Sequence, residues 1–310
     1  MPKTSSEPAA PCERFTLHGT TMGTRWSASV DAHADRALDL AALRRDLAVA
    51  VHLVEQQMSP WKPDSDLMRL NRAPMDTWVD LPAELLQVLA CALDIRRLSA
   101  GAFDPGVGAL VNAWGFGAVR DAPDAAAIQA ARQAAPRPAH EALILDQAAG
   151  RARKRALLQF DLCGIAKAYA VDHMVAVLQQ HGVQHALAAL DGELRAVSSQ
   201  ASGEPWAVAL ARPETGRRAA HGVIELQDLA VATSGDYRRY LQVGDARLAH
   251  TMDPRRAAPV NNTVASVTVL ARSCMHADAW ATALLVAGPG EGLALAQRLG
   301  LDALFPAAPC

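Results

Sequence analysis

The chain has 310 residues, 51% of them hydrophobic and 20% charged, which is enough to bury a substantial core as one large domain or two smaller ones. The formal net charge of −2 at pH 7 argues against nucleic acid as a partner, because nucleic-acid-binding domains carry a basic surface. Basic residues cluster only at Arg151–Arg155 and at Arg217–Arg218, which we interpret as solvated turns. The five cysteines are scattered and lack Cys-x-x-Cys spacing, which argues against a disulfide framework or a structural zinc site.

Residues 1–13 are predicted to be a disordered lead, ahead of a single catalytic domain at 14–305. The lead lacks the apolar region of a signal peptide, and no stretch of the chain reaches the about 18 unbroken apolar residues of a membrane span. We therefore expect a cytoplasmic protein without a transmembrane segment. The alternative is a periplasmic or membrane-anchored protein whose export segment has been removed.

The first half of the domain predicts one strand and two long helices. The strand lies near Trp26–Val30, and a helix with one apolar face runs from Leu40 to Met58, stopping before Pro60. A second helix covers residues 83–99 and ends at a glycine. Residues 118–140, rich in Ala, Pro and Asp, are predicted to form an exposed insertion of helix and loop.

The second half mixes short strands with helices. A helix is predicted from Ile165 to His181, and two more follow at 277–287 and 291–299, with the glycine-rich run 288–292 as a turn between them. The predicted strands are 143–145, 157–160, 186–190, 206–210, 223–226 and 265–270. Because hairpin-like strand pairs alternate with helices without strict β-α-β repetition, the order favours an α+β fold.

Asp278 and Thr282 are the most informative pair for chemistry. They lie four residues apart in a helical segment and so share one face. Carboxylate, hydroxyl and carbonyl oxygens suit a hard cation such as Mg²⁺. Taken alone, such a pair is more often an Asp near a helix start and a Thr bonded back into its own helix.

Three polar clusters in the first half lie at the ends of predicted elements, where functional sites tend to occur. His18–Thr24 offers glycines and threonines that let a ligand approach the backbone, or forms a plain turn. Trp61 in a proline-bracketed loop would stack on a planar ligand or serve as a half-buried anchor. Asp104, in Gly101-Ala-Phe-Asp-Pro, would bind a ligand or cap the turn that Pro105 begins.

Two further clusters follow. Asp161-Leu-Cys-Gly-Ile-Ala-Lys167 joins a strand to a helix, where a lysine and free amides suit an anion, although no Walker A or Gly-x-Gly-x-x-Gly pattern is present. After the run 232–240, His250-Thr-Met-Asp-Pro contains a general-base candidate, since the unperturbed pKa of histidine lies near neutrality. A lone histidine more often only satisfies local hydrogen bonds.

Together and in this order, the six motifs resemble the FAD:protein FMN transferase (ApbE) family of bacterial flavin transferases, over roughly residues 15 to 300. The resemblance implies mixed sheet layers flanked by helices, FAD as substrate and Mg²⁺ as cofactor. It implies transfer of FMN to a threonine or serine hydroxyl of an acceptor flavoprotein through a phosphoester, with release of AMP. It also implies roles for individual residues: Gly164, Asp278 and Thr282 at the metal; Met22, Trp61, Ala102, Phe103, Asp104, Asp161, Lys167 and Met252 at FAD; and His250 as the base.

Three departures from the family pattern stand out. Lys167 is followed by Ala168 where a glycine is usual, Asp191 replaces the first of two glycines before Glu193, and Arg255–Pro259 replaces a threonine-glycine. Asp191 would change one loop and add a carboxylate near the site. Two alternatives to transfer remain: a Mg²⁺-dependent FAD pyrophosphatase that gives FMN and AMP, and a flavin-binding carrier without chemistry.

Overall fold

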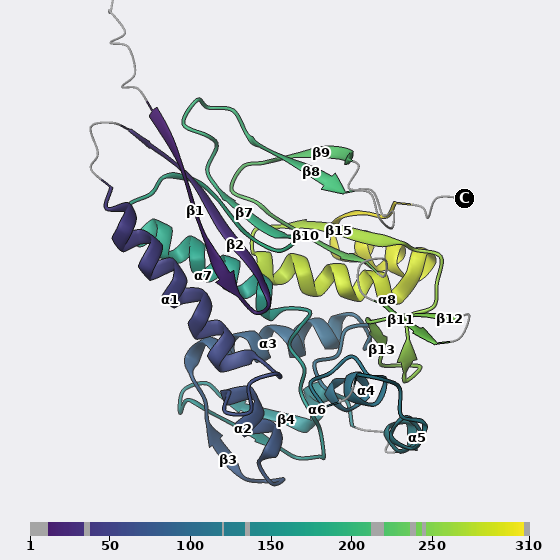
Figure 1. The fold of residues 1–310 in the computed structure, drawn as a ribbon. Helices are drawn as coiled ribbons and strands as arrows, with labels where there is room; N and C mark the ends of the chain where they lie inside the picture. Colours follow the sequence, from purple (N-terminus) through teal and green to yellow (C-terminus); the bar gives the residue numbers. More distant parts are fainter. Residues whose placement is uncertain are drawn as a thin grey trace, which may run out of the picture.

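A seven-stranded antiparallel sheet forms the centre of the fold (Figure 1). The computed structural model describes residues 12–33, 38–119, 121–133, 137–211, 220–235, 240–243 and 246–306. In their order across the sheet, the strands are β1 (Cys12–Thr21), β2 (Thr24–His33), β6 (His185–Leu190), β7 (Glu193–Val197), β10 (Ala230–Gly235), β15 (Ser266–Ala271) and β16 (Asp302–Leu304).

Three helices cover one face of this sheet: α1 (Leu40–Met58), α7 (Ala166–Gln180) and α8 (Cys274–Leu299). In β6 every second residue is buried, and Ala186, Ala188 and Leu190 belong to the main core together with the helices. The opposite face is covered by a hairpin of β8 (Trp206–Ala211) and β9 (Ala220–Leu226). Trp206 belongs to a second, smaller hydrophobic core between this hairpin and the sheet. Successive side chains of β6 therefore point alternately to the two faces of the sheet and contribute to both cores.

A lower lobe packs below the helices in Figure 1. It contains a three-stranded sheet of β3 (Trp78–Asp80), β5 (Arg151–Lys154) and β4 (Leu143–Asp146), and the helices α2 (Asp66–Arg72), α3 (Ala83–Leu98), α4 (Gly108–Ala113), α5 (Ala125–Gln133) and α6 (Ala139–Ala142). Two small hairpins lie beside α8: β11 (Tyr240–Val243) with β12 (Ala246–Ala249), and β13 (Met252–Asp253) with β14 (Ala258–Pro259).

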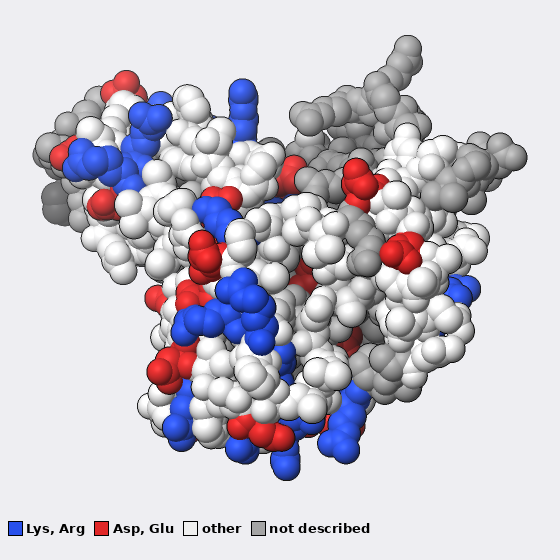
Figure 2. All heavy atoms as spheres, turned by 60° about the horizontal axis from the view of Figure 1, so that its bottom comes forward, with Lys and Arg blue, Asp and Glu red and all other residues white. Residues whose placement is uncertain are grey.

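Most predicted elements lie where the sequence placed them, including α1, α3, α7, β6 and β15. The lead at 1–13 was expected to be disordered; residues 1–11 lie outside the described residues, and β1 begins at Cys12. In the predicted insertion, α5 has no buried residue, whereas Ala139 at its far end is buried. On the face shown in Figure 2, acidic and basic side chains are interspersed and neither sign covers it alone.

The predicted strand at 157–160 is wrong, since the segment forms only an isolated parallel bridge between Gln159 and Val107. Instead of pairing with a strand, Phe160 is held by one side chain: its N–H donates to Asn71 Oδ1 at 2.7 Å and its carbonyl accepts from Asn71 Nδ2 at 2.9 Å. The side-chain amide thus satisfies the backbone groups that a neighbouring strand would otherwise pair.

The interpretation of Arg151–Arg155 as a solvated turn is also wrong, because residues 151–154 form β5. Arg151 and Arg153 stack on the ring of Trp78, at 4.5 and 4.6 Å from its centroid. Lys154 is buried, and its ammonium donates to the Asn71 carbonyl at 2.7 Å. A basic strand is stable here because its charges have aromatic and carbonyl partners.

The predicted pair of C-terminal helices is present: both lie within α8, and a kink at Gly288 separates them. At Gly288 the backbone has φ 79°, a left-handed conformation that favours glycine, and Pro289 follows. α8 starts at Cys274, three residues before the predicted start. Its length and hydropathy match a membrane-spanning helix, but 61% of its most apolar window is buried inside the protein, as in a core helix.

Asp172 on α7 caps the N-terminus of α8. One carboxylate oxygen accepts from Cys274 N at 2.9 Å, and the other accepts from Met275 N at 2.9 Å and from Ser273 Oγ at 2.8 Å. These amides have no partner within their own helix, and a negative charge is stabilised at a helix N-terminus. Arg195 of β7 donates to the same carboxylate at 2.6 Å.

We therefore expect Asp172→Ala to lower the free energy of unfolding by about 2–4 kcal/mol, since it leaves the α8 amides without an acceptor. Urea unfolding followed by circular dichroism measures this. The control is Asp94→Ala, which removes an exposed pair with Arg97 and should cost less than about 1 kcal/mol. Equal losses in the two variants would contradict the role of Asp172.

Candidate functional site

The turn between β1 and β2 forms one wall of the candidate site. Met22 and Gly23 form a two-residue turn with φ of 48° and 69°, the conformation that matches the twist of a hairpin. A hollow of about 480 Å³ is lined here by residues 20–25 and Glu55. Glu55 accepts from Thr21 Oγ1 at 3.3 Å and pairs with Lys62 at 3.6 Å, which brings the Trp61 loop beside this turn.

Trp61 is 57% exposed. This exposure excludes the interpretation of Trp61 as a half-buried anchor. Its large flat ring is open to solvent. An exposed indole at the rim of a hollow is available for stacking on a planar ligand.

Lys167 lies in the first turn of α7 among acidic side chains. Its ammonium is 3.1 Å from Asp191 Oδ2 and 3.4 Å from Glu193 Oε1. Asp191 N donates to the Arg25 carbonyl at 3.2 Å, so this cluster adjoins the β1–β2 turn. Burial lowers the pKa of Lys167, but the charges of Glu193, Asp278 and Asp191 outweigh it and raise the pKa overall.

Asp278 on α8 is buried, and its Oδ2 atom has no hydrogen-bond partner in the structure. Burial raises the pKa of this carboxyl to about 8, the charge of Glu193 adds to the rise, and Lys167 opposes it. Buried carboxylate oxygens are almost always paired. An oxygen kept without a partner beside a lysine is therefore a candidate ligand atom.

Thr282 lies one helical turn after Asp278. Its hydroxyl is 2.9 Å from Ser234 Oγ at the end of β10. A Cβ added to Gly164 would lie 3.4 Å from Thr282 Oγ1 and 3.5 Å from the ring of Phe103. The loop before α7 therefore packs directly against α8 and the 101–105 loop.

The 101–105 loop is tied to its surroundings on both sides. Asp104 accepts from Gly106 N at 2.8 Å and from Arg96 Nε at 2.9 Å, so it does cap the turn at Pro105. The neighbouring residues Ala102 and Phe103 are buried. Asp161 N donates to the Pro105 carbonyl at 2.8 Å, which joins this loop to the loop before α7.

The carboxyl group of Asp161 accepts from Cys163 N at 2.8 Å, and burial raises its pKa. It therefore holds the turn that presents Gly164. This assigns Asp161 a structural contact within the loop, in addition to the ligand contact that the resemblance implies.

The segment after β12 reaches the same region. Met252 is buried and pairs with Pro259 in the β13–β14 hairpin, and half-buried His250 lies two residues before it. Arg255 lies against Gly101, since a Cβ there would be 3.9 Å from Arg255 Cγ. The nearby run 232–240 is described only in part, because residues 236–239 lie outside the described residues.

The structure adds residues that the sequence did not single out. Ser234 lies within the run 232–240, but nothing in the sequence indicates its contact with Thr282. Glu193 was noted only as part of a departure, although its buried carboxylate faces Lys167. Asp172 had no local signal, because the amides it caps lie 102 and 103 residues away.

The residues fit a hard divalent cation, though not through carboxylates alone. Among the described residues, no three His, Cys, Asp or Glu side chains are arranged to hold a metal ion. A cation beside Asp278 would therefore need hydroxyl and carbonyl oxygens as well. Thr282 and the neighbouring backbone of Gly164 supply such groups, and oxygen ligands of this kind suit Mg²⁺.

Known proteins resemble this chain over nearly its whole length. The ApbE family matches residues 22–305. A relative from Vibrio cholerae named FAD:protein FMN transferase is 34% identical over 300 residues, which cover 95% of this chain and 88% of the relative. One of the same name from Klebsiella pneumoniae is 31% identical over 303 residues, covering 96% and 85%.

Solved structures give the same result. The flavin transferase ApbE from Vibrio cholerae superposes with a TM-score of 0.86 at 33% identity, covering 96% of this chain and 95% of that one. The apo form of the Pseudomonas stutzeri flavinyl transferase ApbE gives 0.84 at 32% identity, with 96% and 92% covered. The α+β fold and the resemblance seen in the sequence are confirmed. The chain belongs to the ApbE family, and the relatives matched here are flavin transferases.

Proposed function

We propose that this protein is an FAD:protein FMN transferase that uses Mg²⁺. It transfers the FMN part of FAD to a threonine or serine hydroxyl of an acceptor flavoprotein and releases AMP. The named relatives support the flavin transfer. The cation, the acceptor residue and the second product are the proposal's own additions.

The observation that carries the proposal is the unpartnered oxygen of Asp278. Keeping a carboxylate buried without a hydrogen bond destabilises a fold, so such a group is retained for another purpose. Thr282 lies one turn along the same helix and packs against Gly164. Asp278, Thr282 and the Gly164 carbonyl would hold the cation, which would neutralise charge on the phosphate oxygens.

The reaction requires little beyond position and charge. The acceptor hydroxyl oxygen forms a bond to the phosphorus of the FMN half, the bond from that phosphorus to the bridging oxygen breaks, and AMP leaves with the bridging oxygen. Lys167 offsets the negative charge of the phosphates. His250 accepts the proton of the attacking hydroxyl, and exposed Trp61 stacks on a ring of FAD.

An acceptor assay tests the proposal. With FAD, Mg²⁺ and a flavoprotein that carries a threonine acceptor, the protein should attach yellow fluorescence to the acceptor on a denaturing gel and release AMP. His250→Ala should slow transfer about 10²- to 10⁴-fold with FAD affinity unchanged, because a positioned base contributes that much. Asp278→Ala should abolish the cation-dependent transfer.

The matched control is His181→Ala, which removes a histidine at the far end of α7 from Lys167 and should keep the wild-type rate. AMP released without labelled acceptor would identify a pyrophosphatase that uses water. FAD binding with neither product would identify a carrier. Wild-type rates in both His250→Ala and Asp278→Ala would contradict the assigned roles.

A second prediction concerns stability. Asp278 has a pKa of about 8 in the folded protein, above its ordinary 3.8. Between these pH values the folded protein keeps a proton that the unfolded chain loses, so this group lowers stability as pH rises from about 4 to about 8. Asp278→Asn removes that loss. Its melting temperature in EDTA, relative to wild type, should therefore rise from pH 5 to pH 8.

Asp94→Asn serves as the control, because its carboxylate is exposed and the gap to wild type should not change with pH. A pH-independent gap for Asp278→Asn would show that burial does not hold this proton. The same variant should lose transfer activity, which would separate the contribution of Asp278 to function from its cost to the fold.

A further inference from the structure

Asp191 lies in the two-residue turn between β6 and β7 with φ 57°. This left-handed conformation favours glycine, and aspartate and asparagine tolerate it better than other residues. The turn itself is anchored by the backbone, since Asp191 N donates to the Arg25 carbonyl at 3.2 Å. The backbone therefore does not need the carboxylate, and its purpose lies in what it contacts.

The carboxylate of Asp191 is the outer of two that hold Lys167. Asp191 Oδ2 lies 3.1 Å from the ammonium and its side chain is 40% exposed, whereas Glu193, at 3.4 Å, is 7% exposed. A ligand arriving from solvent would reach the Asp191 pair first. An exposed ion pair is weak enough to be displaced by another anion.

The charge around Lys167 is unbalanced toward the negative. One ammonium faces the carboxylates of Asp191 and Glu193, and the carboxyl group of Asp278 adds a third negative charge only above its pKa of about 8. A dinucleotide brings a pyrophosphate that is itself an anion. Without a cation, its phosphates would have to compete with Asp191 for the one lysine.

We infer that Asp191 is a positioning residue whose carboxylate holds Lys167 until the dinucleotide's phosphates displace it, so that dinucleotide binding depends on a divalent cation. This inference rests on the proposed function, because it takes FAD as the ligand. Asp191 acts through Lys167 and touches no reacting atom. A divalent cation supplies positive charge to the phosphates while Asp191 neutralises the charge of Lys167.

The test is the affinity for FAD, measured by fluorescence titration at low salt in EDTA and again with saturating Mg²⁺. Asp191→Asn keeps the shape and removes the charge, and Asp191→Gly also removes the unfavourable φ. Both should bind FAD up to about fivefold more tightly than wild type in EDTA, because the phosphates no longer have to break the exposed ion pair between Asp191 and Lys167. With Mg²⁺ the gap should shrink.

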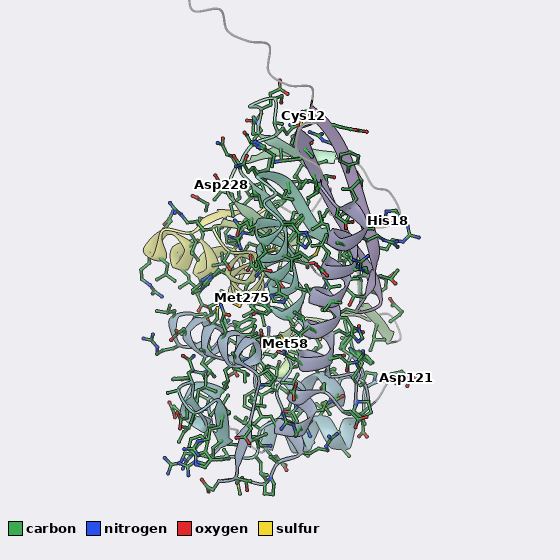
Figure 3. The ribbon with its side chains drawn as sticks, turned by 90° about the vertical axis from the view of Figure 1, so that its left-hand side faces the viewer. Cys12, His18, Met58, Asp121, Asp228 and Met275 are labelled. Atoms are coloured by element: carbon green, nitrogen blue, oxygen red, sulfur yellow. The ribbon has the colours of Figure 1, made fainter. Side chains whose placement is uncertain are left out.

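Two further variants show whether Asp191 acts through the lysine. In the Lys167→Met background, Asp191→Asn should leave FAD affinity unchanged. Asp228→Asn is the matched control, because Asp228 also has a positive φ, at 51°, and lies above Met275 in the upper half of the molecule in Figure 3. It should bind FAD as wild type does.

Each other result overturns the inference. Equal affinity of wild type and both Asp191 variants in EDTA would show that the carboxylate does not compete. The same gain in FAD affinity with and without Lys167 would show that Asp191 acts by general repulsion. Weaker FAD binding by the Asp191 variants than by wild type in Mg²⁺ would make Asp191 a cation ligand. Failure of wild type to bind FAD in either buffer would overturn the proposed function as well, which distinguishes the two failures.

Discussion

The carboxylate of Asp172 is the contact on which the site depends. It satisfies the first amides of α8 and binds Arg195 of β7, so one side chain of α7 joins two helices and the sheet. α7 also carries Lys167 in its first turn, and α8 carries Asp278 and Thr282. The cap therefore sets the position of one wall of the site relative to the other, which packing of apolar surfaces alone specifies less sharply.

The site concentrates unfavourable electrostatics in a stable frame. Three acidic side chains face a single lysine, and the most deeply buried of them, Asp278, has an oxygen with no hydrogen-bond partner. The surrounding core of α7, α8 and the sheet is built from small and aliphatic side chains that bury without polar cost. The stability contributed by this core offsets the free energy by which the acidic cluster destabilises the fold. The cluster is therefore kept in place to bind an anion together with a cation.

Elements with a strong apolar period could be predicted from the sequence, as α1 and α7 show. The cluster of site motifs was found because their order resembles a family, and the structure brings Gly164, Thr282 and Phe103 together. Distant partners could not be predicted. Nothing near Asp172 indicates the amides it caps, and nothing near Arg151 and Arg153 indicates the Trp78 ring that makes a basic segment a strand.

The paired hydrogen bonds between Asn71 and Phe160 have a consequence for how the chain tolerates cleavage. They close a loop across 89 residues that contains most of the lower lobe, so the polypeptide enters and leaves this lobe close to one point. Within that loop, α5 has no buried residue and is the natural place for a protease to cut. Both fragments would retain members of one shared core, Leu85 on one side and Leu158 on the other. A protein nicked there should stay assembled as a two-piece molecule.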